Sequence, residues 1–160
     1  MTPFVPVLAA AALAAAVWDV RARRIPNALS GTLAVLGVVL AGVSRGFPGA
    51  AVALATLAIM LAIGTFVFSR GWFGGGDVKL LAAACCGLAP AQAADFLIYT
   101  GLCGGLLSLY ALATSQWMAT MLITLRLPET GKRLPYAVAI AGGALSLWVA
   151  LLCPVFLVVR

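Results

Sequence analysis

The chain has 160 residues, of which 64% are hydrophobic and only 9% are charged, and its mean hydropathy is +1.16. A soluble domain of this length needs far more polar residues to cover its surface, so the composition excludes a soluble globular protein. The net charge of +6 does not indicate a nucleic-acid-binding protein, because the basic residues stand in short connections between apolar runs. We expect a single membrane-embedded domain over residues 1–160, since no polar linker divides the chain.

The apolar runs predict an all-α polytopic membrane protein with about six transmembrane helices. The expected helices are Pro3–Val20, Ala28–Val43, Gly49–Phe68, Asp77–Leu88, Phe96–Leu125 and Leu134–Val159. Connections that contain glycine or proline separate several of these runs, namely Arg45–Pro48, Ser69–Gly76 and Leu127–Gly131. The first run has no basic residue before it and three arginines after it, which predicts a retained helix rather than a cleaved signal peptide.

The basic residues predict an orientation with the N-terminus outside. Eight of the 10 basic residues then fall on the inside, namely Arg21, Arg23, Arg24, Arg70, Lys79, Arg126, Lys132 and Arg133. Only Arg45 and Arg160 fall outside, and cytoplasmic connections are the ones enriched in Lys and Arg. This orientation puts Asp19, which ends the first helix, and Asp77, which begins the fourth, at the cytoplasmic rim, where water can reach both.

These two aspartates are a candidate catalytic pair. A carboxylate in a membrane segment costs about 2.5–3.5 kcal/mol on insertion scales and indicates a function by default. When two carboxylates share a site, the ionised one can take a proton from water while the protonated one donates to a carbonyl oxygen. The glycines before Asp77 would let an extended backbone approach. The competing interpretations are that Asp19 pairs with a nearby arginine at the interface and that Asp77 caps the fourth helix.

The remaining polar and sulfur-containing residues predict structural roles. We expect Asp95 to cap the fifth helix and Glu129 to be a solvated loop charge. Lys79 stands two residues after Asp77, so a helix turns it away from the aspartate's face and a structural or interfacial role is expected. The chain has no His, so neither a zinc site nor another cofactor is expected. The cysteines are expected to act as small hydrophobic residues in helix packing, at Cys85, Cys86, Cys103 and Cys153.

The order of the motifs resembles that of the type IV prepilin peptidases, which are membrane aspartyl proteases of the GxGD type. Asp19 is followed by Arg24-Ile25-Pro26-Asn27 and later by Gly74-Gly75-Gly76-Asp77-Val78-Lys79, and the late segment Leu134–Ala139 is similar to the last-helix signature of that family. The resemblance implies that Asp19 and Asp77 are the catalytic residues. It implies supporting roles for the motif residues Gly74, Gly76, Lys79, Pro26 and Asn27. An arginine after the first helix (Arg21, Arg23 or Arg24) would dock an acidic residue of the substrate, unless these arginines serve only as a topology signal.

The chain lacks the paired CxxC motifs of the larger bacterial members and so resembles the small CpaA/TadV-type enzymes of Flp/Tad pilus systems. This implies an endopeptidase, without methyltransferase activity, that removes the leader peptide of a prepilin or pseudopilin at the cytoplasmic face of the bacterial inner membrane. Its expected partners are that substrate and membrane lipid, and not nucleic acid.

Three alternatives remain. Two are related enzymes, a preflagellin peptidase and another GxGD intramembrane protease. The third is a small proton-coupled transporter or channel subunit, in which the aspartates would form a proton relay. The placement of both acids at one membrane face favours a peptidase.

Overall fold

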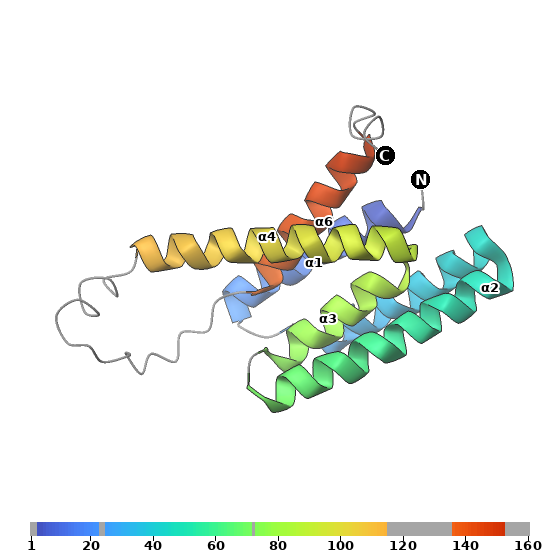
Figure 1. Cartoon of the computed structure of the whole chain (residues 1–160), viewed down its shortest axis with the longest axis horizontal. Helices are drawn as coiled ribbons and strands as arrows, with labels where there is room; N and C mark the ends of the chain where they lie inside the picture. Colours follow the sequence, from blue (N-terminus) through green and yellow to red (C-terminus); the bar gives the residue numbers. More distant parts are fainter. Residues whose placement is uncertain (1–2, 23–24, 72, 115–135, 153–160) are drawn as a thin grey trace.

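The computed structural model describes residues 3–22, 25–71, 73–114 and 136–152. Every regular element in these ranges is an α-helix, which confirms the all-α prediction (Figure 1). The helices are α1 (Phe4–Ala22), α2 (Asn27–Ser69), α3 (Gly75–Cys86), α4 (Pro90–Thr114) and α6 (Tyr136–Leu152). The predicted connection Leu127–Gly131 and the end of the last predicted helix lie outside the described residues.

Helix α2 is a hairpin of two helical arms. Gly46 has φ 70°, a left-handed conformation that glycine adopts without strain, and the chain reverses there just before Pro48 (Figure 1). Gly49 brings the two arms close together, because a Cβ at this position would overlap the carbonyl oxygen of Ala41. The arms correspond to two of the predicted helices, those expected on either side of the Arg45–Pro48 connection.

The surface and the helix lengths are those of a membrane protein. Three helical segments are long and apolar enough to cross a membrane, namely α1, α2 and the Pro90–Tyr110 part of α4, and α6 is a shorter apolar helix. Large apolar side chains face outward, Val43 and Phe47 being 79% and 86% exposed.

Helix α3 is shorter than a membrane span, with 12 residues. At 1.5 Å per residue it is about 18 Å long, well short of the roughly 30 Å hydrocarbon core.

Helices α1 and α3 run antiparallel. Phe4, at the start of α1, packs against Gly87, where a Cβ would lie 2.5 Å from the phenyl ring. Beyond the other end of α1, Ile25 packs against Gly76 in the first turn of α3, where a Cβ would lie 3.2 Å from the Ile25 Cβ. The C-terminus of α1 and the N-terminus of α3 are therefore at the same end of the bundle, on the left in Figure 1. We call this end the motif end.

The bundle consists of two closely packed helix pairs, α2 with α3 and α4 with α6. Helix α1 joins the pairs through its contacts with α2 and α6. Its apolar residues share one buried core with α3 and α6, in which Leu8, Leu80 and Leu147 are at most 1% exposed. Contacts between α3 and the α4–α6 pair are sparse by comparison, and the pocket described below lies at this loosely packed boundary.

Two expectations about helix starts are wrong. Helix α4 begins at Pro90 and not at Phe96, because the Gln92 side chain accepts a hydrogen bond (3.3 Å) from the Ala89 N–H and Pro90 suits a first helical position. Asp95 therefore lies within α4 and does not cap it. The N-cap of α3 is Gly74, so Asp77, the third residue of the helix, is not its cap either.

Candidate active site at the motif end

Asp19 lies on the inward side of α1. It is half-buried in the last turn of the helix. Ala15 and Ala12, which lie about one and two turns earlier on the same face, are both 0% exposed, whereas the neighbouring Trp18 and Val20 are 56% and 62% exposed. The position of Asp19 therefore continues the buried face of α1 and not its outer face.

Asp77 has the corresponding position on α3. It is half-buried in the first turn, and Leu80 and Ala84, which follow it by one and two turns, are both 0% exposed. Gly74 stands directly beside the carboxylate, since a Cβ added there would lie 2.7 Å from Asp77 Oδ2. A larger residue at position 74 would therefore crowd the Asp77 side chain, which gives the first glycine of the GxGD motif a steric reason.

The opposite directions of α1 and α3 bring the two aspartates to the same end of the bundle. The contact between Phe4 and Gly87 fixes the opposite end of both helices. From this contact, a rise of 1.5 Å per residue places Asp19 about 22 Å along α1 and Asp77 about 15 Å along α3. The two acids thus differ by about 7 Å in height. Both lie at the motif end, as the alternation of the predicted spans led us to expect.

The two sequence motifs contact each other at this end. Lys79 Nζ donates a hydrogen bond of 3.1 Å to Asn27 Oδ1, across 52 residues of sequence. Pro26 is the N-cap of α2, with φ −60° and ψ 129°, and its carbonyl accepts a hydrogen bond from the Leu29 N–H. Together with the packing of Ile25 on Gly76, these contacts hold the segment after α1 against the start of α3. Lys79 therefore links the start of α2 to the first turns of α3.

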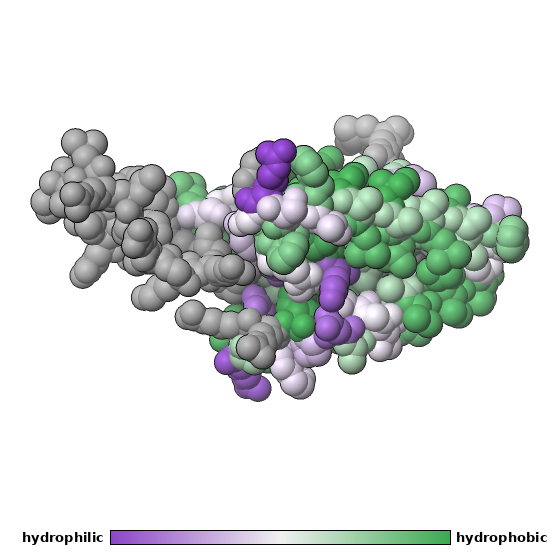
Figure 2. All heavy atoms as spheres, turned by 90° about the horizontal axis from the view of Figure 1, so that it is seen from below, coloured by the Kyte–Doolittle hydropathy of each residue, from purple (hydrophilic) through white to green (hydrophobic). Residues whose placement is uncertain are grey.

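The basic residues that the structure describes follow the predicted distribution. Arg21, Arg70 and Lys79 lie at the motif end, and Figure 2 shows strongly hydrophilic surface towards that end of the molecule. Arg45 lies at the opposite end, where its Nη2 donates a 3.3 Å hydrogen bond to the carbonyl of Gly87 and so satisfies a carbonyl at the end of α3. Two of the arginines proposed to dock substrate, at positions 23 and 24, lie outside the described residues, as does Glu129.

The described cysteines serve helix packing. Cys85, Cys86 and Cys103 are free thiols, and the first two are buried. Cys86 packs so closely on Gly37 of α2 that a Cβ there would lie 2.7 Å from its Sγ. Cys153 lies outside the described residues. Within the described part of the chain, no group of three His, Cys, Asp or Glu side chains is arranged to hold a metal ion.

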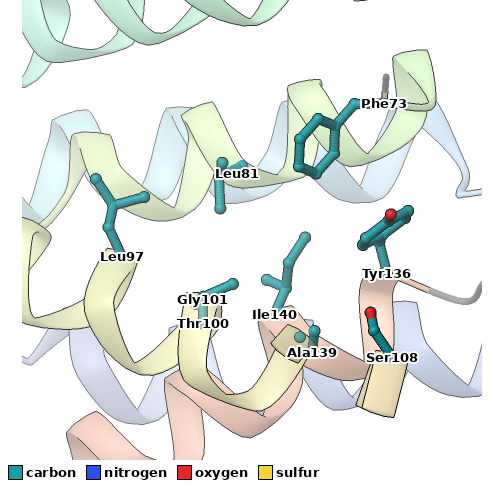
Figure 3. Close-up of a pocket in the computed structure, with 10 residues that line it drawn as sticks. Phe73, Leu81, Leu97, Thr100, Gly101, Ser108, Tyr136, Ala139 and Ile140 are labelled. Carbon is teal, nitrogen blue, oxygen red and sulfur yellow. The ribbon is translucent and has the colours of Figure 1, made fainter. Parts of the chain in front are cut away.

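The sequence did not predict an open, mainly apolar pocket of about 270 Å³ between α3, α4 and α6 (Figure 3). Its far end is at Leu97, and at the motif end the rings of Phe73 and Tyr136 face each other. The other lining residues are Leu81, Thr100, Gly101, Gly104, Ser108, Ala139 and Ile140.

The helical bundle, its apolar exterior and the two inward acids at one end define a polytopic membrane protein with a polar site near one membrane face. The model of the type IV leader peptidase family matches residues 6–109, a range that includes Asp19, Asp77 and both motif segments. The chain therefore belongs to the type IV leader peptidase family, and it is a membrane peptidase. No curated protein and no solved structure matches the chain.

Proposed function

We propose that this protein is an aspartyl endopeptidase in which Asp19 and Asp77 activate water to cleave the leader peptide of an Flp-type prepilin or pseudopilin. One observation carries the proposal. Both acids extend the buried faces of their helices at the same end of the bundle, next to a glycine-rich segment that a substrate backbone can approach. Membership of the leader peptidase family supports a prepilin-type substrate in general.

The reaction needs no group beyond the two carboxyls and water. The ionised carboxylate takes a proton from water as the water oxygen attacks the scissile carbonyl carbon, and the protonated carboxyl donates its proton to the carbonyl oxygen. The resulting gem-diol intermediate then collapses: one of its hydroxyls returns a proton to the carboxylate that had donated it, and the C–N bond breaks as the leaving amine receives a proton from the carboxyl that took it from water. One proton has then passed from water to the amine, and each carboxyl is back in its starting protonation state for another turnover.

We also propose that the motif end faces the cytoplasm. Three basic residues (Arg21, Arg70 and Lys79) lie at that end, and cytoplasmic connections are enriched in Lys and Arg. Reporter fusions after Arg24 and after Lys132 are expected to report a cytoplasmic location in both cases. A periplasmic signal from either fusion would mean that the two acids do not share the cytoplasmic face.

The function is tested by co-expression with a candidate Flp-type prepilin, with loss of the leader scored by gel shift. Asp19→Asn and Asp77→Asn are each expected to abolish processing, because an amide can neither accept the proton from water nor donate as the carboxyl does. Asp95→Asn is the matched control, since Asp95 is a half-buried acid in α4 near the opposite end of the bundle.

The controls separate catalysis from folding. All three variants are expected to insert in the membrane and to elute as monodisperse protein in detergent, and Asp95→Asn is expected to process at the wild-type rate. Cleavage by a well-folded Asp19→Asn or Asp77→Asn variant removes that residue from the catalytic pair. If the wild-type protein leaves every Flp-type prepilin intact, the substrate class is wrong.

A further inference from the structure

The pocket between α3, α4 and α6 lies next to Asp77 on the surface of α3. Leu81, which lines the pocket, follows Asp77 by one helical turn, so their Cβ atoms are about 5–6 Å apart. Phe73, at the motif end of the pocket, comes four residues before Asp77. A polypeptide whose scissile bond lies at Asp77 therefore reaches the pocket within about two residues, at roughly 3.3 Å per extended residue.

The mouth of the pocket is formed by two aromatic rings from distant parts of the sequence. The ring centroids of Phe73 and Tyr136 are 5.1 Å apart with an interplanar angle of 43°, and Figure 3 shows both rings at one end of the pocket. Phe73 is 39% exposed, so the mouth is accessible from the motif end. Tyr136 is the first residue of α6 and belongs to the late segment Leu134–Ala139. The pocket thus joins that segment to the segment that carries Asp77.

The size of the pocket suits one large side chain. An engineered apolar cavity of about 150 Å³ binds benzene, so a volume of about 270 Å³ accommodates an aromatic or a large aliphatic side chain. Two glycines on α4, Gly101 and Gly104, contribute to this space because they bring no side chain into it.

The position of the pocket beside Asp77 favours a segment of the substrate over a lipid acyl chain as the occupant. Thr100 lines the pocket, but its Oγ1 is buried against Gly143 of α6 and does not face the occupant. Ser108 and Tyr136 add two further hydroxyl-bearing side chains to the lining.

We propose that this pocket binds one large apolar side chain of the substrate, from a residue within about two positions of the cleaved bond, and that it thereby determines which polypeptides are processed. The inference rests on the proposed function, because it uses Asp77 to locate the cleaved bond. It assigns a substrate-binding role to residues of α4 and α6, of which α6 lies outside the range matched by the family model.

Two glycines on α4 make a matched test. A Cβ added to Gly101 or to Gly105 would meet no atom within 4 Å, so both positions tolerate a larger residue on local steric grounds. Both glycines are exposed, but Gly101 lines the pocket and Gly105 does not. Gly101→Leu therefore adds a side chain at the pocket lining, whereas Gly105→Leu adds the same side chain one helical turn further along α4, at a position outside the lining.

The experiment measures kcat/KM in detergent for a series of prepilin variants. Each apolar residue within three positions of the cleaved bond is replaced in turn by Ala and by Phe. We expect one position at which the wild-type protein prefers Phe to Ala by about tenfold or more. Gly101→Leu is expected to lose this preference while it still cleaves the Ala substrate, and Gly105→Leu is expected to keep it.

A second measurement identifies the occupant without relying on cleavage. Leu97 is replaced by its photoreactive diazirine analogue in the full-length Asp77→Asn variant, and the protein is irradiated in membranes with the prepilin. A crosslink to the prepilin supports the proposal, whereas crosslinks to lipid alone overturn it. An unchanged Phe-to-Ala ratio in Gly101→Leu also overturns it, as does an equal loss of activity on both substrates. In each of these cases cleavage by the wild-type protein leaves the proposed function intact.

Discussion

The two sides of α3 are packed in opposite ways. Towards α2, the helix is in such close contact that a Cβ on Gly64 would overlap Val78, and the hydrogen bond between Lys79 and Asn27 ties the helix to the start of α2. Towards α4 and α6, the same helix borders an open pocket. The side of α3 that is held against α2 is therefore distinct from the side that borders this pocket.

Glycine contributes to both sides, with opposite results. Against α2, Gly64 and Gly37 bring backbone into contact with side chains of α3, which is how helices in membranes gain packing energy without a hydrophobic driving force. Against the pocket, no atom lies within 4 Å of a Cβ built on Gly101, so the missing side chain leaves space unfilled. The effect of a glycine in this bundle therefore depends on whether a partner helix faces it closely.

The largest expected effect on stability comes from replacing a glycine by alanine on each of the two helices that face α3, namely α2 and α4. Gly64→Ala is expected to lower the free energy of unfolding by about 1–3 kcal/mol, because the new methyl group overlaps Val78. Gly101→Ala is expected to leave it unchanged or raise it by up to about 1 kcal/mol, because alanine restricts the unfolded backbone and meets nothing. Thermal unfolding in detergent measures the difference between the two variants.

A compensating substitution checks the cause. Adding Val78→Ala to Gly64→Ala removes the overlapping methyl groups and is expected to recover part of the lost stability, although Val78→Ala alone destabilises the protein by removing buried apolar area. If the two losses simply add, the overlap between these residues is not what limits the packing of α3 on α2.

The helices could be predicted from the sequence because each is an apolar run with a local stop signal. The reversal at Gly46 was expected within the Arg45–Pro48 connection, and the two arms of α2 follow from it. The start of α4 was missed because hydropathy rises only at Phe96. The local signal that marks the true start was nevertheless present, a proline at the first helical position with a glutamine two residues later.

The candidate site could be predicted only in part. Successive spans cross the membrane in opposite directions, so the order of the predicted helices was enough to expect Asp19 and Asp77 at one end of the bundle. The pairing of Lys79 with Asn27 could not be predicted, since it depends on how α3 is rotated against the start of α2. The pocket could not be predicted either, because its walls come from three helices whose packing angles no local pattern specifies.

The smallest expected effect concerns the hydrogen bond between Lys79 and Asn27. The pair is exposed, so Lys79→Met or Asn27→Leu is expected to lower the free energy of unfolding by no more than about 1 kcal/mol. The bond nevertheless joins the segment that follows Asp19 to the helix that carries Asp77. A small shift between the acids is enough to slow catalysis, so each variant is expected to lose about tenfold in kcat with little change in KM.

A double-mutant cycle distinguishes this positioning role from a merely structural one. The double variant Lys79→Met with Asn27→Leu is expected to be no slower than either single variant, because each change breaks the same bond. Lys79→Arg is expected to retain most of the wild-type rate, since a guanidinium can still donate to the Asn27 side chain. If the single variants unfold earlier but the folded enzyme keeps its kcat, the bond contributes to stability alone and the alignment of the aspartates depends on the glycine contacts with α2.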